Sequence, residues 1–406
     1  MKHYTAWEYL LMDAATHQGL GKKTFEERIQ WGRDNLASLE QHQDTAEDIP
    51  LYRAAVLAIR EVEAGRPIGT LVSMDAVCSG LQLMAVLSGD VNAGRMTGLV
   101  DTNRRPDAYT DMTNHMNTLL GSQAVTISRT EAKDAVMTAF YGSKSVPKHL
   151  FGEGSPALKA FYKTLETQAP GPWQLVNLLL KAWNPKQDFH EWAMPDDFQV
   201  RIPSLVKNSG RVEVEELDGI SFTYEWEEQA AYKKGLHLPA NVIHSVDAYA
   251  ARCMHRRLNY NPQKLQEAWD YLSTLLLGRE CGEPSPNELP EAFPGTWNWS
   301  GLVDLNMLNL PKDQWSAFPT PMIRQLIAII RRSLAYRDFH LVTIHDDYRC
   351  HPNHMNRVRE EYRHILVEIS RSTLMKDLLE QLGMPGYRKI SQGLTRHLEK
   401  SAYALT

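Results

Sequence analysis

The stretch FHLVTIHDDYRCHP, residues 339–352, decides the fold because an apolar run ends there in two adjacent acidic residues. The β-branched and aromatic residues up to Ile344 are typical of a buried strand, and His345, Asp346 and Asp347 follow at once. Burying a carboxylate without a positive partner is costly, and burying two together costs more. The stretch therefore indicates either a strand that meets a solvated turn or a site where a divalent cation supplies the missing charge.

The composition is that of a soluble globular protein large enough for two or three structural units. Of its 406 residues 43% are hydrophobic and 23% are charged, and the formal net charge is −5. This charge does not favour a nucleic-acid partner, although a local basic surface would remain compatible with one. The four cysteines are scattered and form no C-x-x-C pair, which favours a reducing compartment. Because no signal peptide or membrane-length apolar run is apparent, we expect a soluble intracellular protein.

Periodicity predicts a largely helical chain with no internal repeat. The stretch 278–301 is rich in Pro, Gly and Trp and is predicted to be an irregular insertion. Apolar residues at helical spacing predict helices over residues 5–65, 125–145, 155–192 and 321–338.

Two segments show strand signals. GTLVSMD, residues 69–75, predicts a short strand, and the helix after it has Ser79 as its predicted N-cap and Gly89 as its end. Residues 211–228 alternate around Asp218-Gly219, which predicts a β-hairpin.

Asp75 comes at the end of the predicted strand 69–75, where the backbone would hold a carboxylate rigidly. Taken alone, such a residue is more often structural or solvated. Together with Asp346 it could hold two magnesium ions, since magnesium combines a few carboxylates with waters and substrate phosphates.

The segment SRTEAKDAVMTAFYGSKSV, residues 128–146, has the features of a phosphate-binding helix start. Ser128 and Glu131 fit a capping box, which places Arg129 at the first helical position and Lys133 one turn later. A cation in the first turn opposes the helix dipole unless an anion is bound there. Spacing alone favours a solvated basic face, and the alternative is a cradle for a polyphosphate.

Paired carboxylates and a polyphosphate cradle together indicate nucleotidyl transfer. A metal-dependent phosphohydrolase with a His-Asp pair is the less favoured alternative. Such pairs normally lie on helices among further His and Asp ligands, whereas FHLVTIHDDY has the pattern of a strand.

Three segments, in this order, resemble the catalytic motifs of the phage and mitochondrial single-subunit RNA polymerases, which are right-hand polymerases related to DNA polymerase I. The family's D-G-S-C-S-G-I-Q is similar to DAVCSGLQ at 75–82, and its R-x-x-x-K-x-x-x-M-T-x-x-Y-G-S-K is similar to RTEAKDAVMTAFYGSK at 129–144. Its H-D-S is similar to residues 345–347. NVIHSVD at 241–247 resembles a fourth stretch, N-F-V-H-S-Q-D, and TFEERIQW at 24–31 resembles the segment before the first motif.

The resemblance implies an α+β right-hand polymerase fold, with Asp75 and Asp346 on the palm and the helix from Arg129 to Tyr141 in the fingers. The family's thumb and large N-terminal domain have no counterpart in this sequence. We expect residues 1–95 to hold N-terminal helices and the first part of the palm, 96–204 the fingers, 205–260 a specificity-type hairpin and palm, 261–322 an insertion, and 323–406 the palm with the third motif and C-terminal helices.

The resemblance also implies the metal and phosphate contacts. Asp75 and Asp346 are expected to bind two Mg²⁺ ions, and the carbonyl of Ala76 is a further expected metal contact. Arg129 and Lys133 are expected to grip the incoming triphosphate.

The remaining expected roles concern the nucleoside and the primer. The resemblance implies that Tyr141 selects ribonucleotides through the 2′-hydroxyl, with Gly142 beside it in the nucleotide site and as the cap of the helix. It implies that His244 contacts the nascent base pair and that His345 supports the primer end. Asp347 replaces the family's Ser; a solvated neighbour is the favoured interpretation and a third acidic ligand the alternative.

The family's D-x-x-G-R segment has no match in this chain. Because a right-hand polymerase needs a thumb to hold its product, we expect a second, smaller chain that supplies the missing half, as in a split, heterodimeric phage RNA polymerase. DNA template, RNA product and ribonucleoside triphosphates are the other expected partners, with no membrane, in the host cytoplasm if the chain is phage-encoded. The hairpin 211–228 lies where the family carries its promoter-specificity loop, but its acidic residues argue against strong major-groove recognition.

Two alternatives remain within the same superfamily. One is an inactive, nucleic-acid-binding subunit, which the presence of every motif carboxylate and cation disfavours. The other is a DNA polymerase or primase, and the C-S-G-x-Q segment and the S-K after Tyr-Gly favour the RNA-synthesising branch.

Overall fold

The computed structural model describes residues 1–102, 104–121, 126–232, 235–282 and 300–406. Its main sheet is antiparallel and three-stranded, with the strand order β1-β7-β6. The strands are β1 Val72–Asp75, β6 Val342–Ile344 and β7 Asp347–Cys350. The strand predicted over 69–75 is therefore confirmed, with shorter bounds than the sequence suggested.

The stretch 339–352 forms a hairpin rather than one buried strand. β6 lies at the edge of the sheet, and Val342 and Ile344 are exposed there, so the prediction of a buried strand is wrong for this part. The buried strand is β7, where Tyr348 and Cys350 are fully covered. The apolar run does not distinguish the two cases, because burial of a strand depends on what packs against the faces of the sheet: β1 is also an edge strand, yet its Val72 and Met74 are buried.

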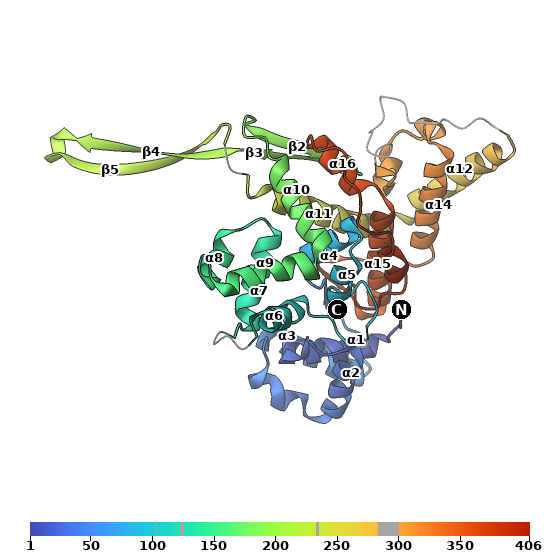
Figure 1. Cartoon of the computed structure of the whole chain (residues 1–406). Helices are drawn as coiled ribbons and strands as arrows, with labels where there is room; N and C mark the ends of the chain where they lie inside the picture. Colours follow the sequence, from blue (N-terminus) through green and yellow to red (C-terminus); the bar gives the residue numbers. More distant parts are fainter. Residues whose placement is uncertain (103, 122–125, 233–234, 283–299) are drawn as a thin grey trace.

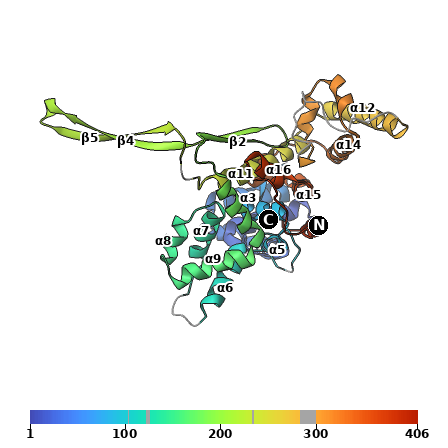
Figure 2. The same cartoon turned by 45° about the horizontal axis from the view of Figure 1, so that its top comes forward.

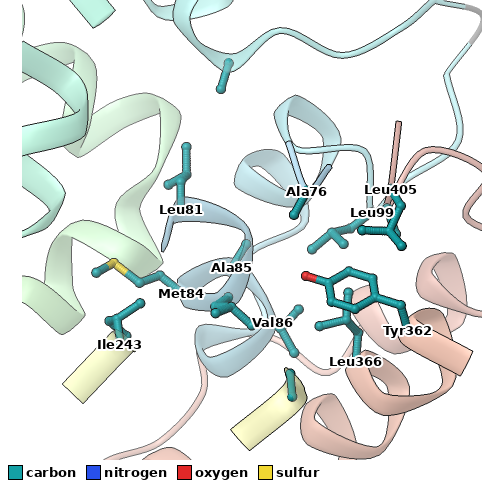
Figure 3. Close-up of a cluster of buried hydrophobic side chains, with 14 of the residues drawn as sticks. Ala76, Leu81, Met84, Ala85, Val86, Leu99, Ile243, Tyr362, Leu366 and Leu405 are labelled. Carbon is teal, nitrogen blue, oxygen red and sulfur yellow. The ribbon is translucent and has the colours of Figure 1, made fainter. Parts of the chain in front are cut away.

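Helix α4, Ser79–Ser88, follows β1 and is buried on nearly all sides. It packs against α10 (Pro170–Ala182), α11 (Leu238–Leu258) and α15 (Met355–Arg371), as the side chains around it show in Figure 3. An apolar helix of this kind belongs in a core. Its predicted end at Gly89 is confirmed by a φ of 75°, but Ser79 is its first residue and not its cap.

The N-terminal residues form the helices that the sequence predicted over 5–65. Thr5 and Thr24 cap their helices with complete capping boxes. The helices are α1 Ala6–Ala15, a π-helix Thr16–Leu20, α2 Phe25–Asp34, a 3₁₀ helix Leu36–Thr45 and α3 Ile49–Glu63. They pack on one another at the bottom of the molecule in the view of Figure 1.

The middle of the chain is helical as far as Ala182. Its helices are α5 Val91–Met96, α6 Ala108–Leu120, α7 Arg129–Phe140, α8 Ser145–Phe151, α9 Pro156–Gln168 and α10. The predicted helix over 155–192 is wrong at its end, because β2 Phe189–Ala193 pairs with β3 Gln199–Pro203. Burial alternates along β2, with Trp192 inside and Glu191 outside, which is the two-residue period of a strand.

The predicted hairpin is confirmed and is longer than expected. β4 Leu205–Val214 pairs with β5 Ile220–Gln229 along its whole length. Its turn ends in Asp218 and Gly219, which have φ values of 53° and 76°. The hairpin projects from the body of the molecule in both views (Figures 1 and 2).

A second, smaller core lies beside the first. Helices α12 Pro262–Glu280 and α14 Thr320–Leu334 pack together with two 3₁₀ helices, Leu305–Asn309 and Lys312–Ala317. Residues 278–280 of the predicted insertion belong to α12, and its residues 283–299 lie outside the described residues. The chain ends with α15, α16 Leu374–Gln381 and α17 Leu394–Leu398.

No helix in the described ranges is both long and apolar enough to cross a bilayer. The four cysteines are Cys78, Cys253, Cys281 and Cys350, and all are free thiols.

Candidate active site

A cavity of about 840 Å³ lies where the central sheet meets α4, α7 and the N-terminal helices. Its wall includes six of the residues that the sequence singled out. They are Asp75, Ala76 and Asp346 from the sheet and Arg129, Lys133 and Tyr141 from α7 and its end. Segments far apart in the sequence therefore meet at one site.

Backbone pairing brings the acidic residues together. Asp75, the last residue of β1, lies opposite Asp347, the first residue of β7. Asp346 belongs to the two-residue turn between β6 and β7, and its carbonyl oxygen accepts a hydrogen bond from the amide of Ala76 at 3.3 Å. His345, the other turn residue, has a φ of 56°, a left-handed conformation that a turn this tight requires. The turn thus presents Asp346 beside Asp75.

The negative charge gathered here shifts the titration of its neighbours. Burial, then Asp346 and Asp347, raise the pKa of Asp75 to about 7, although one side of Asp75 stays open to the cavity. Burial and Asp346 likewise raise the pKa of Asp247 to about 6. One carboxylate oxygen each of Asp247 and Asp347 is buried without a hydrogen-bond partner. Such an excess of buried negative charge fits a cation.

Asp347 is not the solvated neighbour that the sequence suggested. Its Oδ2 accepts a hydrogen bond from Arg349 Nε at 2.7 Å, and only 19% of its side chain is exposed. Burial raises its pKa even though the guanidinium of Arg349 opposes the shift. Asp347 is therefore a partly buried member of the acidic group, and its charge is already paired with the guanidinium of Arg349.

Asp247 was missed as a site residue, although a signal was present in the sequence. It lies in α11, three residues after His244, and three residues along a helix return to the same face. Asp346 influences the pKa of both residues. The helical spacing within NVIHSVD could have marked Asp247 as a companion of His244.

In the described part of the chain, no three His, Cys, Asp or Glu side chains are placed to hold a metal ion by themselves. Asp75, Asp346 and the carbonyl of Ala76 nevertheless suit magnesium, which usually keeps waters and substrate phosphates among its ligands. The uncompensated charge around Asp75 agrees with this donor set.

The N-terminus of α7 forms as predicted. Glu131 accepts a hydrogen bond from the amide of Ser128 at 2.9 Å, and Ser128 Oγ accepts one from the amide of Glu131 at 3.3 Å. Arg129 donates from Nε and Nη2 to the two carboxylate oxygens of Asp107, at 2.8 and 3.1 Å. Lys133 is exposed on the cavity wall and has no ion pair within the described residues. Arg129 is thus oriented by the carboxylate of Asp107, whereas Lys133 has no charged partner among the described residues.

Tyr141 ends α7 and lies against the start of α4. A Cβ on Gly80 would come within 2.6 Å of the Tyr141 hydroxyl, so only glycine leaves room for the ring. The ring of His244 lies 5.0 Å from the Tyr141 ring. Burial raises the pKa of Tyr141 to about 12, which keeps its hydroxyl protonated at neutral pH. A protonated hydroxyl at this place can donate a hydrogen bond into the cavity.

Four predicted site residues do not line the cavity: Gly142, His244, His345 and Asp347. Gly142 has a φ of 93°, and a Cβ there would lie 2.5 Å from the carbonyl oxygen of Leu236. Position 142 therefore requires glycine, because residue 236 approaches the backbone closely at the end of α7. His244 lies beside the site, with its ring next to that of Tyr141 and its pKa influenced by Asp346.

Arg105 was not predicted, yet it lines the cavity next to Asp75. Its Nη2 donates to Thr406 Oγ1 at 2.9 Å, and the amide of Thr406 donates to the carbonyl of Asp75 at 2.9 Å. Burial lowers the pKa of Arg105. Its position depends on the packing of residues 403–406 beside β1, for which no local pattern gives a signal.

Residues 68–150 match a family model described as DNA-dependent RNA polymerase. The match contains β1, α4 and α7, and with them Asp75, Arg129, Lys133 and Tyr141. Asp346 lies outside the matched residues. No curated protein matches the chain. The match indicates an RNA polymerase domain, and so a nucleotidyltransferase, over this part of the chain.

Proposed function

We propose that this chain is the catalytic subunit of a DNA-directed RNA polymerase that joins ribonucleotides on a DNA template. One observation carries the proposal. Pairing of β1 with β7 sets Asp75 and Asp346 at a cavity whose wall also holds Arg129 and Lys133. Paired carboxylates facing two cations are the elements that phosphoryl transfer from a triphosphate needs.

In this proposal Asp75 and Asp346, with the carbonyl of Ala76, hold two Mg²⁺ ions. Bound there, magnesium supplies positive charge that activates the attacking hydroxyl and stabilises the leaving oxygen. The role of the chain is to keep the carboxylates on a rigid sheet edge, so that no strand has to move to complete the site.

Arg129 and Lys133 bind the triphosphate. The bidentate pair with Asp107 holds the Arg129 guanidinium in place, and its remaining N–H groups serve a phosphate. Burial alone would raise the pKa of Asp107, but Arg129 outweighs it and lowers that pKa, so Asp107 stays ionised. Lys133 adds a second positive charge one turn along the helix.

The nucleoside end of the substrate meets Tyr141 and His244. The proposal assigns the Tyr141 hydroxyl to the 2′-hydroxyl of the ribonucleotide and His244 to the nascent base pair. His345, exposed in the β6–β7 turn, supports the primer end. Gly142 allows the end of α7 to approach residue 236 and so positions Tyr141.

Tyr141→Phe is expected to lower the preference for ribonucleotides over deoxynucleotides by about one to two orders of magnitude, because the variant removes a hydrogen bond to the distinguishing hydroxyl. The measurement is the ratio of kcat/KM for a ribonucleotide and its deoxy analogue on one primed template. Tyr162→Phe, a change in α9 outside the cavity lining, is the matched control. An unchanged ratio in Tyr141→Phe would remove Tyr141 from sugar selection.

Magnesium binding is expected to strengthen as the pH rises. In the absence of metal the pKa of Asp75 is about 7. Below that pH its carboxyl group is mostly protonated and must lose the proton before a cation can bind. The apparent affinity should therefore rise by up to about tenfold per pH unit towards pH 7 and level off above it. Titration of the metal-free protein with Mg²⁺ by calorimetry at several pH values measures this. A flat profile in the wild type would contradict it.

The direct test is ribonucleotide incorporation on a primed single-stranded DNA template with magnesium. The proposal includes a second, smaller chain, and its support is that no segment of the sequence matches the family's D-x-x-G-R. Synthesis that requires a co-purifying chain agrees with a two-chain enzyme, and synthesis by the chain alone would refute the need for a partner. Retained nucleic-acid binding without synthesis would favour an inactive structural subunit.

A further inference from the structure

The hairpin β4–β5 carries an apolar face that no other described element covers. Side chains alternate along paired strands, so every second residue lies on the same face. The face holds three aromatic rings in a row, Phe222, Tyr224 and Trp226, which are 53%, 46% and 43% exposed. Its aliphatic members are Val206, Val212, Val214 and Ile220.

The rings on this face are ordered with respect to one another. The Tyr224 and Trp226 rings stack with their centroids 5.3 Å apart. The Tyr224 ring also lies over Gly210 of the opposite strand, where a Cβ would come within 2.6 Å of it. A ring that packs over a strand glycine is held close to the sheet. The face is therefore a flat, preformed aromatic surface.

The hairpin is strongly acidic. Residues 205–229 contain seven carboxylates and two cations, a net charge of −5 that equals the formal net charge of the whole chain. Both cations are engaged within the hairpin, since Lys207 pairs with Glu227 at 3.8 Å and Arg211 Nε donates to Ser221 Oγ at 2.9 Å. The carboxylates are Glu213, Glu215, Glu216, Asp218, Glu225, Glu227 and Glu228.

The charge distinguishes between the possible occupants of this face. Nucleic acid carries a dense negative charge, and a surface with seven carboxylates and no unengaged cation would repel it. A second copy of the chain would set two equally acidic hairpins against each other. Glu228 shares the aromatic face, and Glu215, Glu216 and Asp218 lie at the turn beside it. A protein surface that joins an apolar groove to Lys and Arg side chains satisfies both the aromatic face and these adjacent carboxylates.

We propose that the apolar face of the β4–β5 hairpin is a docking surface for a second protein, which presents an apolar groove bordered by basic side chains. Two further features support this. An isolated two-stranded hairpin is marginally stable in water, and this one extends away from the body (Figures 1 and 2). Exposed Tyr and Trp in a contiguous patch are the residue types that dominate binding energy at interfaces. The inference stands independently of the polymerase activity.

The test places a photo-crosslinking amino acid in the full chain, at position 222 on the apolar face or at position 223 on the opposite face, in cells of its source. We expect one polypeptide to be captured from position 222 and not from position 223. Mass spectrometry then identifies that protein and its crosslinked segment, which should contain Lys or Arg. The purified protein serves as the probe in all subsequent binding measurements.

Two sets of variants measure the apolar and the electrostatic contributions to partner binding. The triple variant Phe222→Ser, Tyr224→Ser and Trp226→Ser should weaken binding of the purified partner by about tenfold or more. Glu216→Lys at the turn with Glu228→Lys on the aromatic face should also weaken it, and added salt should weaken wild-type binding. Ser221→Ala with Thr223→Ala, on the opposite face, is the matched control and should leave the affinity unchanged. An unchanged melting temperature shows that each variant is folded.

Three results would overturn the proposal: a nuclease-sensitive product at position 222, capture of a second copy of this chain there, or no product from that position. A captured protein whose affinity is unaffected by both sets of variants would overturn it as well. Ribonucleotide incorporation by the triple variant on a primed template is measured in parallel. Loss of partner binding with synthesis retained separates this inference from the proposed catalytic function.

Discussion

Replacement of Asp346 by asparagine is expected to lower ribonucleotide incorporation by about a thousandfold or more, because a lost metal ligand removes several kcal/mol of charge stabilisation from the transition state. Asp346 lies in the β6–β7 turn, and its main chain accepts a hydrogen bond from Ala76 that asparagine leaves intact. The fold should therefore be preserved. Single-turnover incorporation on a primed template, with circular dichroism as a check of folding, measures the effect.

Asp75→Asn is expected to abolish synthesis equally and to stabilise the metal-free protein. The pKa of Asp75 rises from 3.8 to about 7 on folding, so the ionised carboxylate destabilises the fold, and metal-free stability falls as the pH rises through that interval. Asparagine carries no charge, so the variant should be more stable at pH 8 by on the order of 1 kcal/mol, a value kept small because the side chain is open to the cavity. Thermal unfolding in a chelator measures this.

Asp44→Asn is the matched control for both substitutions, since the Asp44 side chain is 82% exposed. It is expected to change neither the rate nor the melting temperature. Full activity in Asp75→Asn or Asp346→Asn would contradict the assignment of these residues as metal ligands. An Asp75→Asn protein that is less stable at pH 8 would contradict the electrostatic account of the site.

Replacement of Glu361 by glutamine is expected to cost about 3–5 kcal/mol of stability, because it leaves the buried guanidinium of Arg357 without its counter-charge and Arg257 with Glu368 alone. Glu361 is fully buried in α15. Its Oε1 lies 3.0 Å from Arg257 Nη1 of α11, and its Oε2 lies 2.6 Å from Arg357 Nη2. A third guanidinium, that of Arg332 in α14, is 3.7 Å away. The carboxylate thus connects three helices, and chemical denaturation followed by circular dichroism measures its effect.

The pH dependence of stability provides a second test of the role of Glu361. Burial would raise the pKa of Glu361, but the three arginines outweigh burial and lower it. A lowered carboxylate pKa contributes stability that is present above the unfolded value of 4.5 and is lost as the pH falls through the folded value. Glu361→Gln should therefore be less sensitive to acid than the wild type.

Glu360→Gln is the matched control, because the Glu360 side chain is 18% exposed, against 1% for Glu361, and pairs with the 56% exposed His3. Its expected cost is below about 1 kcal/mol, as is usual for exposed ion pairs. A loss of similar size in both variants would show that Glu361 does not have the special role that its burial implies.

Local sequence patterns were sufficient to predict most of the elements and the chemical identity of the site. Capping residues such as Ser128 with Glu131 set where a helix starts, because they satisfy its first amides. Asp218-Gly219 set the hairpin turn, because few residues adopt positive φ at low cost. Asp75, Asp346, Arg129 and Lys133 could be named in advance because they lie at recognisable strand and helix ends.

Only the tertiary structure decided which of these residues meet and in what environment. Whether β6 is buried depends on what packs against its side chains, and whether Asp347 is solvated depends on the reach of Arg349. Asp247 is placed near Asp346 by α11, and Arg105 is held near Asp75 by its hydrogen bond to Thr406. Both α11 and residues 403–406 are distant in sequence from the strands that they approach. Local patterns record backbone preference over a few residues, whereas burial and charge coupling depend on contacts between remote segments, which form only when the chain packs.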